Sequence, residues 1–256
     1  MAAGIGSRLR QLIGDKPKCL IEAEGVTLIS RSVSLLEQRG ICDIAVVTGY
    51  KSDLIRHELQ GRVRYFHNPY FEVTNSIASL WLARDTLCND VILMNADLYY
   101  EEEVLDLARS QTESVVMLSD CTRIEAADFR FGVRGNRILK TGNQLSDDET
   151  DCEYVGIVRI DGSFIGVFRD RLESMIQRGD FRNWWEGVLY SFIGDGIDIF
   201  HRDVEGAFWT EVDHLGDYDR LTTWVSNNRI LKSSIEPPLL DRPDPLPLSA
   251  RSASSR

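Results

Sequence analysis

The first residues of the chain combine glycines with positive charges, a combination that suits the binding of phosphate. Gly4 and Gly6 let a loop bend sharply, so that its backbone amides can approach phosphate oxygens. Arg8 and Lys18 supply the positive charge that the amides lack. A glycine-rich turn without a ligand is the alternative interpretation. The residues that we predict to bind a nucleotide here are Ala3, Gly4, Gly6, Ser7 and Arg8.

Two aspartates that are far apart in the sequence each follow an apolar run. Asp97 comes after VILM, and Asp213 closes the stretch WTEVD, in which Glu211 is a weaker candidate. Carboxylates at the carboxyl ends of parallel strands lie where such sheets bind ligands, and Mg²⁺ favours hard oxygen ligands. An aspartate after a strand is also a common turn or capping residue. We predict that Asp97 and Asp213 converge on one Mg²⁺, as a triphosphate substrate requires.

Two other stretches are candidates for contacts with a nucleotide or a second substrate. In TNSIASL, Asn75 and Ser79 stand at the expected start of a helix, where Thr74 as a simple N-cap is the alternative. In NWWE, Trp184, Trp185 and Glu186 place two aromatic rings beside a carboxylate, a set that can surround an amine. The alternative for this second set is core packing and a helix cap.

The elements that must position these residues follow from the hydrophobic pattern. Short β-branched runs alternate with amphipathic segments, which predicts an α/β fold with a mostly parallel sheet and helices on both faces. We expect strands at residues 43–48, 63–66, 90–95, 114–118, 154–160, 197–202 and 209–212, and a hairpin at 131–140. We expect helices at residues 28–38, 51–59, 75–86, 102–110, 164–178, 183–193 and 217–227, and a loop at 142–153.

The composition of the chain excludes some classes of partner and location. The 256 residues carry a net charge of −11, which disfavours nucleic acid as a partner. No apolar run is long enough to span a membrane and no signal peptide is visible, so we expect a cytoplasmic protein. Residues 233–256 contain five of the seven prolines and predict a disordered tail. The five cysteines form no CxxC pair, and we interpret them as reduced thiols, mostly buried.

Together, these motifs resemble the nucleotidyltransferases of sugar phosphates and choline phosphate. AAGIGSR followed by KPKCL is similar to their signature, and Asp97 and Asp213 match their metal-binding aspartates. Residues 68–80 look like the branch that transfers cytidylyl groups to choline phosphate and aminoethylphosphonate. EYVGI also resembles a family element, which makes Glu153 and Tyr154 candidates for the acceptor site beside Trp184, Trp185 and Glu186.

The resemblance covers roughly residues 1–226 and implies a Rossmann-like fold of the nucleotide-diphospho-sugar transferase type. It implies a nucleotidyltransferase domain over residues 1–232, with a nucleotide-binding half at 1–118 and an acceptor-binding half at 119–232. The implied reaction is Mg²⁺-dependent transfer of CMP from CTP to a small phosphate- or phosphonate-bearing acceptor, with Arg8 and Lys18 as catalytic residues. The alternatives are a sugar-1-phosphate nucleotidyltransferase that uses UTP, GTP or dTTP, and an inactive nucleotide-binding regulatory protein. The sequence does not decide whether the protein forms a homodimer.

In this family the glycine-rich loop follows a hydrophobic strand in the middle of the sheet. Here the loop begins at Ala2, with only Met1 before it. A parallel sheet that lacks a central strand leaves two ladders of backbone groups unpaired. We therefore expect that Met1 is an internal methionine and that a strand rich in Val, Ile and Leu precedes it.

Overall fold

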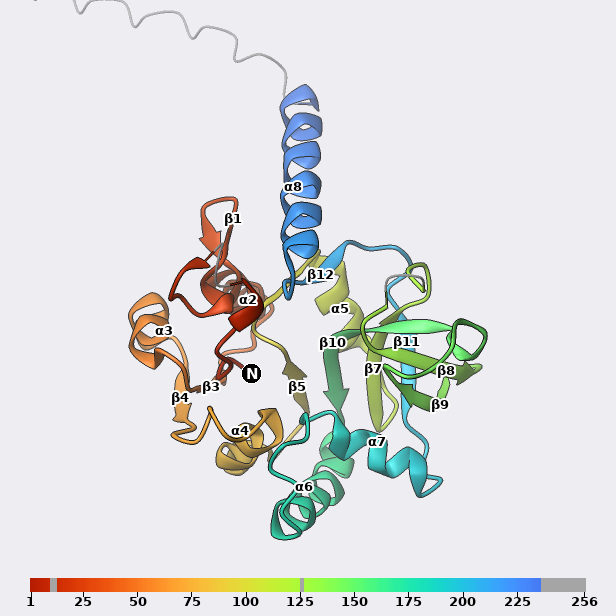
Figure 1. Ribbon diagram of the computed structural model, residues 1–256. Helices are drawn as coiled ribbons and strands as arrows, with labels where there is room; N and C mark the ends of the chain where they lie inside the picture. The colour runs from red at the N-terminus through yellow and green to blue at the C-terminus, as the bar shows by residue number, and fades with distance from the viewer. Residues whose placement is uncertain (10–12, 125–126, 236–256) are drawn as a thin grey trace, which may run out of the picture.

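The computed structural model describes residues 1–9, 13–124 and 127–235 (Figure 1). The strands are β1 Glu22–Ala23, β2 Val26–Thr27, β3 Ala45–Thr48, β4 Arg64–His67, β5 Val91–Met94, β6 Leu98–Tyr100, β7 Val115–Asp120, β8 Arg130–Arg134, β9 Arg137–Gly142, β10 Cys152–Ile160, β11 Phe200–Asp203 and β12 Trp209–Glu211. The α-helices are α2 Leu28–Gln38, α3 Ser52–Leu59, α4 Ser76–Leu82, α5 Glu102–Ser110, α6 Gly162–Gln177, α7 Gly187–Gly194 and α8 Leu215–Ile235. The 3₁₀ helices are η1 Ser7–Leu9, η2 Lys18–Leu20, η3 Arg84–Thr86 and η4 Asp147–Glu149.

The main sheet runs in the order β5-β10-β7-β11-β9-β8. β10 is antiparallel to both β5 and β7, whereas β11 is parallel to β7. β3 and β4 form a parallel pair beside this sheet, and β12 pairs with β6 in the antiparallel direction. The α/β class is therefore confirmed. The main sheet is mixed rather than mostly parallel as predicted, because β10 is antiparallel to β5 and β7, and β9 is antiparallel to β11 and β8.

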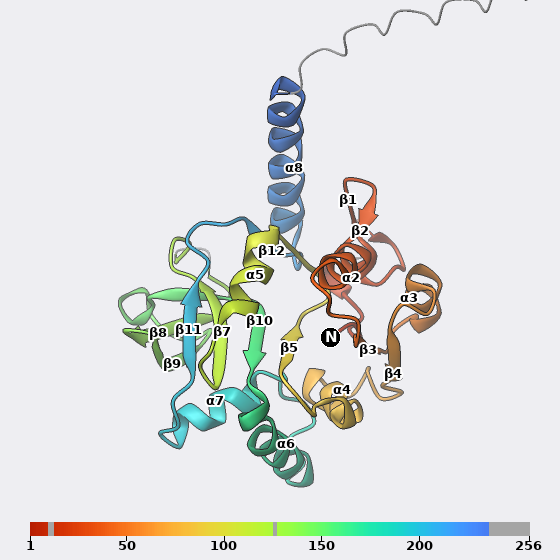
Figure 2. The same ribbon diagram turned by 180° about the vertical axis from the view of Figure 1, so that it is seen from behind.

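Alternating residues of the central strands point into two cores, one on each face of the sheet. Leu118 of β7 and Val155 of β10 pack in the core that includes α2, α3 and α5. Met117 and Val158 of the same two strands pack in the core that includes α4, α6 and α7. The predicted helices on both faces are therefore present, as the two opposite views show (Figure 2).

A cavity of about 520 Å³ lies between β3 and β5, and Met1 reaches into it from one end. The Met1 ammonium donates a hydrogen bond to the Met94 carbonyl (2.6 Å), and the Ala96 amide donates to the Met1 carbonyl (3.2 Å). On the other side, Ala2 pairs in parallel with Thr48 of β3. These two residues thus lie where a strand between β3 and β5 would end, and a strand before Met1 stays a prediction.

Several predicted boundaries need correction. The helix expected at 183–193 begins only at Gly187, so that NWWE forms the turn before α7. The helix expected at 217–227 is longer, since α8 runs to Ile235 and projects from the body of the molecule (Figure 1). Residues 233–235 of the predicted tail are therefore helical, and residues 236–256 lie outside the described residues. Two short elements, the β1–β2 hairpin and β6, were not expected.

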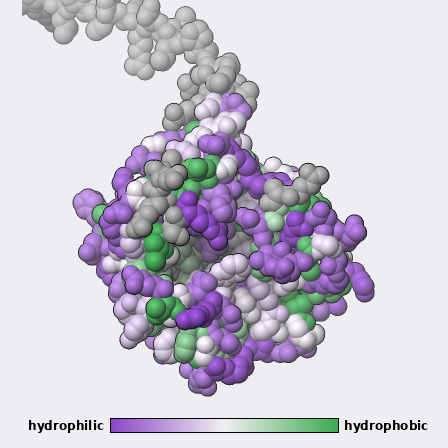
Figure 3. Space-filling model, viewed as in Figure 1, coloured by the Kyte–Doolittle hydropathy of each residue, from purple (hydrophilic) through white to green (hydrophobic). Residues whose placement is uncertain are grey.

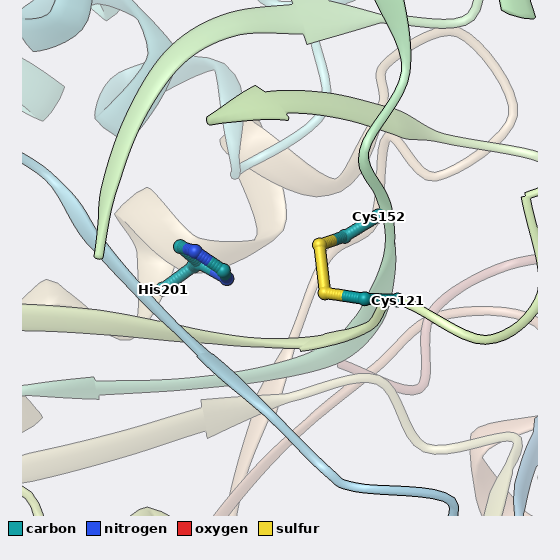
Figure 4. Close-up of side chains that lie close together, drawn as sticks. All are labelled: Cys121, Cys152 and His201. Carbon is teal, nitrogen blue, oxygen red and sulfur yellow. A yellow bond between two sulfur atoms is a disulfide. The ribbon is translucent and has the colours of Figure 1, made fainter. Parts of the chain in front are cut away.

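The prediction of reduced, mostly buried cysteines is wrong. Cys121 and Cys152 form a disulfide (Figure 4), and of the other three only Cys19 is buried. The two partners are 31 residues apart in sequence, and the antiparallel pairing of β7 with β10 brings them together. His201 lies near enough to complete a metal-binding trio. However, the sulfurs bind each other, and the ring nitrogens of His201 contact the Ser119 hydroxyl and the Gly135 carbonyl.

Within the described residues, no helix has both the length and the apolar character needed to cross a membrane.

Candidate active site

The glycine-rich loop folds back over the side chain of Lys18. Gly6 has a φ of +65°, and a Cβ on this residue would lie 2.4 Å from Cγ of Lys18. Only glycine adopts this positive φ without strain and leaves the Lys18 side chain where it is. Gly4, by contrast, has open space around it, so that the loop backbone at this point is accessible to a ligand.

Lys18 lies between the two predicted metal ligands. Its Nζ is 2.5 Å from Oδ2 of Asp97 and also contacts Oδ1 of Asp213. Burial alone would lower the pKa of Lys18, but the charges of Asp97 and Asp213 and their hydrogen bonds outweigh burial and raise it. The lysine is therefore a fixed positive charge at the floor of the site.

A short antiparallel pair brings the two aspartates together. β6 follows Asp97, β12 precedes Asp213, and the two strands pair with Glu211 opposite Leu98. The Val212 amide also donates a hydrogen bond to the Asp97 carbonyl (3.0 Å). The predicted convergence of Asp97 and Asp213 is thus present in the structure, through a pairing that the sequence pattern did not reveal.

Glu211 is closer to the centre of the site than the sequence suggested. Carboxylate oxygens of Asp97, Glu211 and Asp213 all lie within 4.8 Å of one another. Burial, followed by the charges of the two aspartates, raises the pKa of Glu211, and Asn95 Nδ2 donates to its Oε1 (3.2 Å). Three crowded carboxylates share the charge of one lysine, and their hard oxygens fit Mg²⁺. Whether the protein depends on Mg²⁺ stays a prediction.

Arg8 lies at the open side of this cluster. Its Nη1 is 3.3 Å from Oδ2 of Asp213 and 3.5 Å from Nε2 of His214. The arginine side chain is 62% exposed, so that it can turn toward a phosphate without breaking a buried contact. His214 also lines the cavity.

A cavity of about 740 Å³ connects the loop and the carboxylates with an aromatic surface, and the same face of the molecule is hollowed near its centre (Figure 3). We call this surface the acceptor wall. It consists of Asp128, Phe129, Tyr154, Trp184, Glu186 and Tyr190. Phe129 stacks on Tyr190 with ring centroids 4.8 Å apart, and Trp184 meets Phe129 edge-on at 5.9 Å. Burial raises the pKa of Glu186 to about 7.

Two residues that were predicted to contact the acceptor lie outside the cavity. Trp185 is 1% exposed and packs in the core, where its Nε1 donates to Oδ1 of Asn95 (3.2 Å). Glu153 is 5% exposed, and its Oε1 accepts a hydrogen bond from the Asp128 amide (3.0 Å). Neither side chain is among those that line the cavity, so the structure gives no support to the predicted contact of either residue with the acceptor.

Asn75 and Ser79 also line the cavity. Asn75 is the N-cap of α4, and its Oδ1 accepts from the Ser76 amide (2.7 Å). Thr74, the alternative cap, instead donates its hydroxyl to the Tyr70 carbonyl (2.8 Å). Ser79 is 1% exposed and accepts from Nδ2 of Asn68 (2.9 Å). Nucleotide contacts by Asn75 and Ser79 stay predictions.

Sequence reasoning missed Asp128, Phe129 and Tyr190. None of them belongs to a motif with characteristic spacing. Asp128 and Phe129 lie in the connection before β8, and Tyr190 lies in α7. An aromatic residue beside an acidic one at 128–129 was the only signal in the sequence.

Comparison with known proteins gives consistent matches. The sequence profile of the MobA-like NTP transferase domain matches residues 1–133, which include the loop, Lys18 and Asp97. CTP:phosphoglutamine cytidylyltransferase of Campylobacter jejuni is 24% identical over 245 residues, covering 86% of this chain and 96% of that protein. CMP-5'-(3-aminopropyl)phosphonate synthase of Streptomyces rubellomurinus is 32% identical over 234 residues, covering 85% of this chain and 37% of that protein.

Among solved structures, CTP:phosphocholine cytidylyltransferase of Streptococcus pneumoniae superposes with a TM-score of 0.71 at 22% identity. The superposition covers 88% of this chain and 96% of that chain. The predicted fold of the nucleotide-diphospho-sugar transferase type is therefore confirmed.

Proposed function

Because the chain belongs to the MobA-like NTP transferase family, we propose that it transfers CMP from CTP to a small phosphate- or phosphonate-bearing acceptor and releases pyrophosphate. Two similar proteins are named for CMP or cytidylyl transfer, to phosphoglutamine in one case and to aminopropylphosphonate in the other. The observation that carries the proposal is the position of Lys18. It lies at the floor of one cavity, between two aspartates, with the glycine-rich loop on one side and the acceptor wall on the other.

In the proposed reaction, an oxygen of the acceptor attacks the α-phosphorus in line, the bond to the β-phosphate oxygen breaks, and pyrophosphate leaves. Amides of the loop at Gly4 and Gly6 and the guanidinium of Arg8 hold the triphosphate. Lys18 neutralises charge on the α-phosphate, where negative charge accumulates in the transition state. The acceptor oxygen is ionised near neutral pH, so that the reaction needs no general base.

Asp97, Glu211 and Asp213 are the residues that hold Mg²⁺ in this proposal, since their oxygens form a compact, negatively charged group. The ion neutralises phosphate charge when it is bound. Two of these carboxylates, Asp97 and Asp213, also keep Lys18 in place before the nucleotide arrives.

The acceptor wall favours an acceptor that carries a small cationic amine. Phe129, Trp184 and Tyr190 pack on one another and line the cavity, and aromatic rings attract cations. The carboxylates of Asp128 and Glu186 lie on the same wall. An amine at the far end of the acceptor leaves its phosphate or phosphonate group free to reach Lys18.

The test is a measurement of pyrophosphate release with four nucleotides, namely CTP, UTP, GTP and dTTP, against phosphocholine, 2-aminoethylphosphonate, phosphoglutamine and glucose 1-phosphate. We expect release with CTP and an amine-bearing acceptor in MgCl₂ and none in EDTA. Release only with glucose 1-phosphate and another nucleotide would identify a sugar-1-phosphate nucleotidyltransferase instead. Calorimetric binding of a nucleotide without release under any condition would point to a regulatory protein.

A further inference from the structure

Two residues of the acceptor wall come from a connection without regular structure. Asp128 and Phe129 stand between β7 and β8, where the backbone forms bends rather than a helix or strand. Irregular backbone is not fixed by a repeating pattern of hydrogen bonds, so that its position depends on individual contacts. Individual contacts must therefore fix the backbone of Phe129 at the place where its ring stacks on Tyr190 and meets Trp184.

Three consecutive residues of β10 hold this connection from behind. Cys152 is bonded to Cys121 at the start of the connection. Oε1 of Glu153 accepts from the Asp128 amide at 3.0 Å. The amide of Tyr154 donates to the Phe129 carbonyl at 2.9 Å. Of these three attachments, only that of Glu153 is made by a side chain that carries charge.

Glu153 is an unusual residue for a purely structural contact. It is 5% exposed, and its Oε2 has no hydrogen-bond partner within the described residues, although Nη1 of Arg123 is 3.6 Å away. Burial raises its pKa to about 7, against the hydrogen bond from Asp128 and the charge of Arg123. An incompletely satisfied buried carboxylate costs stability, and an apolar residue at this position would avoid that cost.

We propose that Glu153 is a positioning residue for the acceptor: it fixes the backbone at Asp128 and so holds Phe129 in the acceptor wall. Glu153 is not among the residues that line the cavity, so we expect it to act without touching the substrate. Its effect is on the affinity for the acceptor, while the nucleotide side, built from the loop and the carboxylates, is independent of it. The effect on acceptor affinity rests on the proposed function, whereas the effect on the backbone does not.

The experiment compares Glu153→Ala, Glu153→Gln and Val158→Ala. The alanine variant removes the acceptor of the hydrogen bond, and the glutamine variant keeps an oxygen at that place. Val158 lies on the same strand and is fully buried in the core, so that its truncation controls for general loss of stability. Hydrogen–deuterium exchange of the peptide that contains Asp128 and Phe129 is measured without substrate, and steady-state kinetics are measured with CTP and the acceptor.

We expect Glu153→Ala to speed exchange in this peptide and to raise the KM for the acceptor roughly tenfold, with the KM for CTP unchanged. Glu153→Gln should restore both values toward those of the wild type, and Val158→Ala should change neither. The proposal would be overturned if Glu153→Ala and Val158→Ala showed the same exchange rate in this peptide, or the same KM for the acceptor. If the wild-type protein transfers CMP to no acceptor, the proposed function is wrong. Hydrogen–deuterium exchange of the peptide with Asp128 and Phe129 then still decides whether Glu153 fixes the acceptor wall.

Discussion

Replacing Lys18 by Met should destabilise the protein, and Mg²⁺ should reverse part of the effect. Methionine keeps the aliphatic stem that packs on Gly6 but removes the charge between Asp97 and Asp213. These three side chains are 14–25% exposed, so that the loss should lie at the lower end for a broken buried ion pair, about 3 kcal/mol. For a domain of this size that corresponds to a decrease in Tm of about 5–10 °C.

The assay is thermal unfolding at pH 7.5 in EDTA and in MgCl₂. The pKa of Lys18 is raised in the folded state, so its stabilising contribution is complete below its ordinary pKa of 10.5. In EDTA the carboxylates of the variant keep only the exposed Arg8, which pairs with Asp213, whereas in MgCl₂ the ion compensates for the lost charge. Mg²⁺ should therefore raise the Tm of the variant more than that of the wild type. Lys16→Met, at an exposed lysine of the same segment, is the control. An equal Mg²⁺ effect on wild type and Lys18→Met would refute the reasoning.

Three other predictions concern the same cavity. Asp97→Asn and Asp213→Asn should each lower kcat by orders of magnitude while the circular dichroism spectrum stays that of the folded protein; near-normal turnover in saturating Mg²⁺ would remove that residue from the site. Gly6→Ala should lower both Tm and activity because its Cβ has no room, whereas Gly4→Ala should keep the wild-type Tm, and equal Tm values for the two would contradict the loop geometry. Trp184→Ala should raise the KM for an amine-bearing acceptor and leave that for CTP unchanged; unchanged acceptor selectivity would exclude a role for this ring.

The nucleotide side of the site could be predicted because its chemistry lies in short stretches of sequence. The glycines of the loop, Lys18, and Asp97 soon after an apolar strand can be recognised by residue type and local spacing. The sequence did not reveal β6, and without it Glu211 ranked only as a weaker candidate, although its carboxylate lies close to those of Asp97 and Asp213. A strand of three residues gives too short a hydrophobic pattern to be recognised.

The acceptor side was predicted less well because residue type does not determine which way a side chain points. Trp184 and Trp185 are adjacent and chemically identical, yet the first is 48% exposed on the wall and the second 1% exposed in the core. Their directions differ because they lie in the turn before α7, where no helical period applies. The disulfide escaped prediction for a related reason: only the antiparallel course of β10 along β7 brings Cys121 to Cys152.

The nucleotide side and the acceptor side of the cavity differ in which substitutions they can tolerate. On the nucleotide side, a substitution at Gly6 or Lys18 alters a contact that the transfer itself needs. On the acceptor side, Phe129 is held through its backbone by Tyr154, and its ring packs on Trp184 and Tyr190. Substitutions in the connection before β8 can therefore reshape the acceptor wall while Lys18 and the carboxylates stay in place. On this argument, variants selected for a new acceptor should carry changes near Asp128 and Phe129 far more often than in the glycine-rich loop, and an even spread of changes over both regions would contradict it.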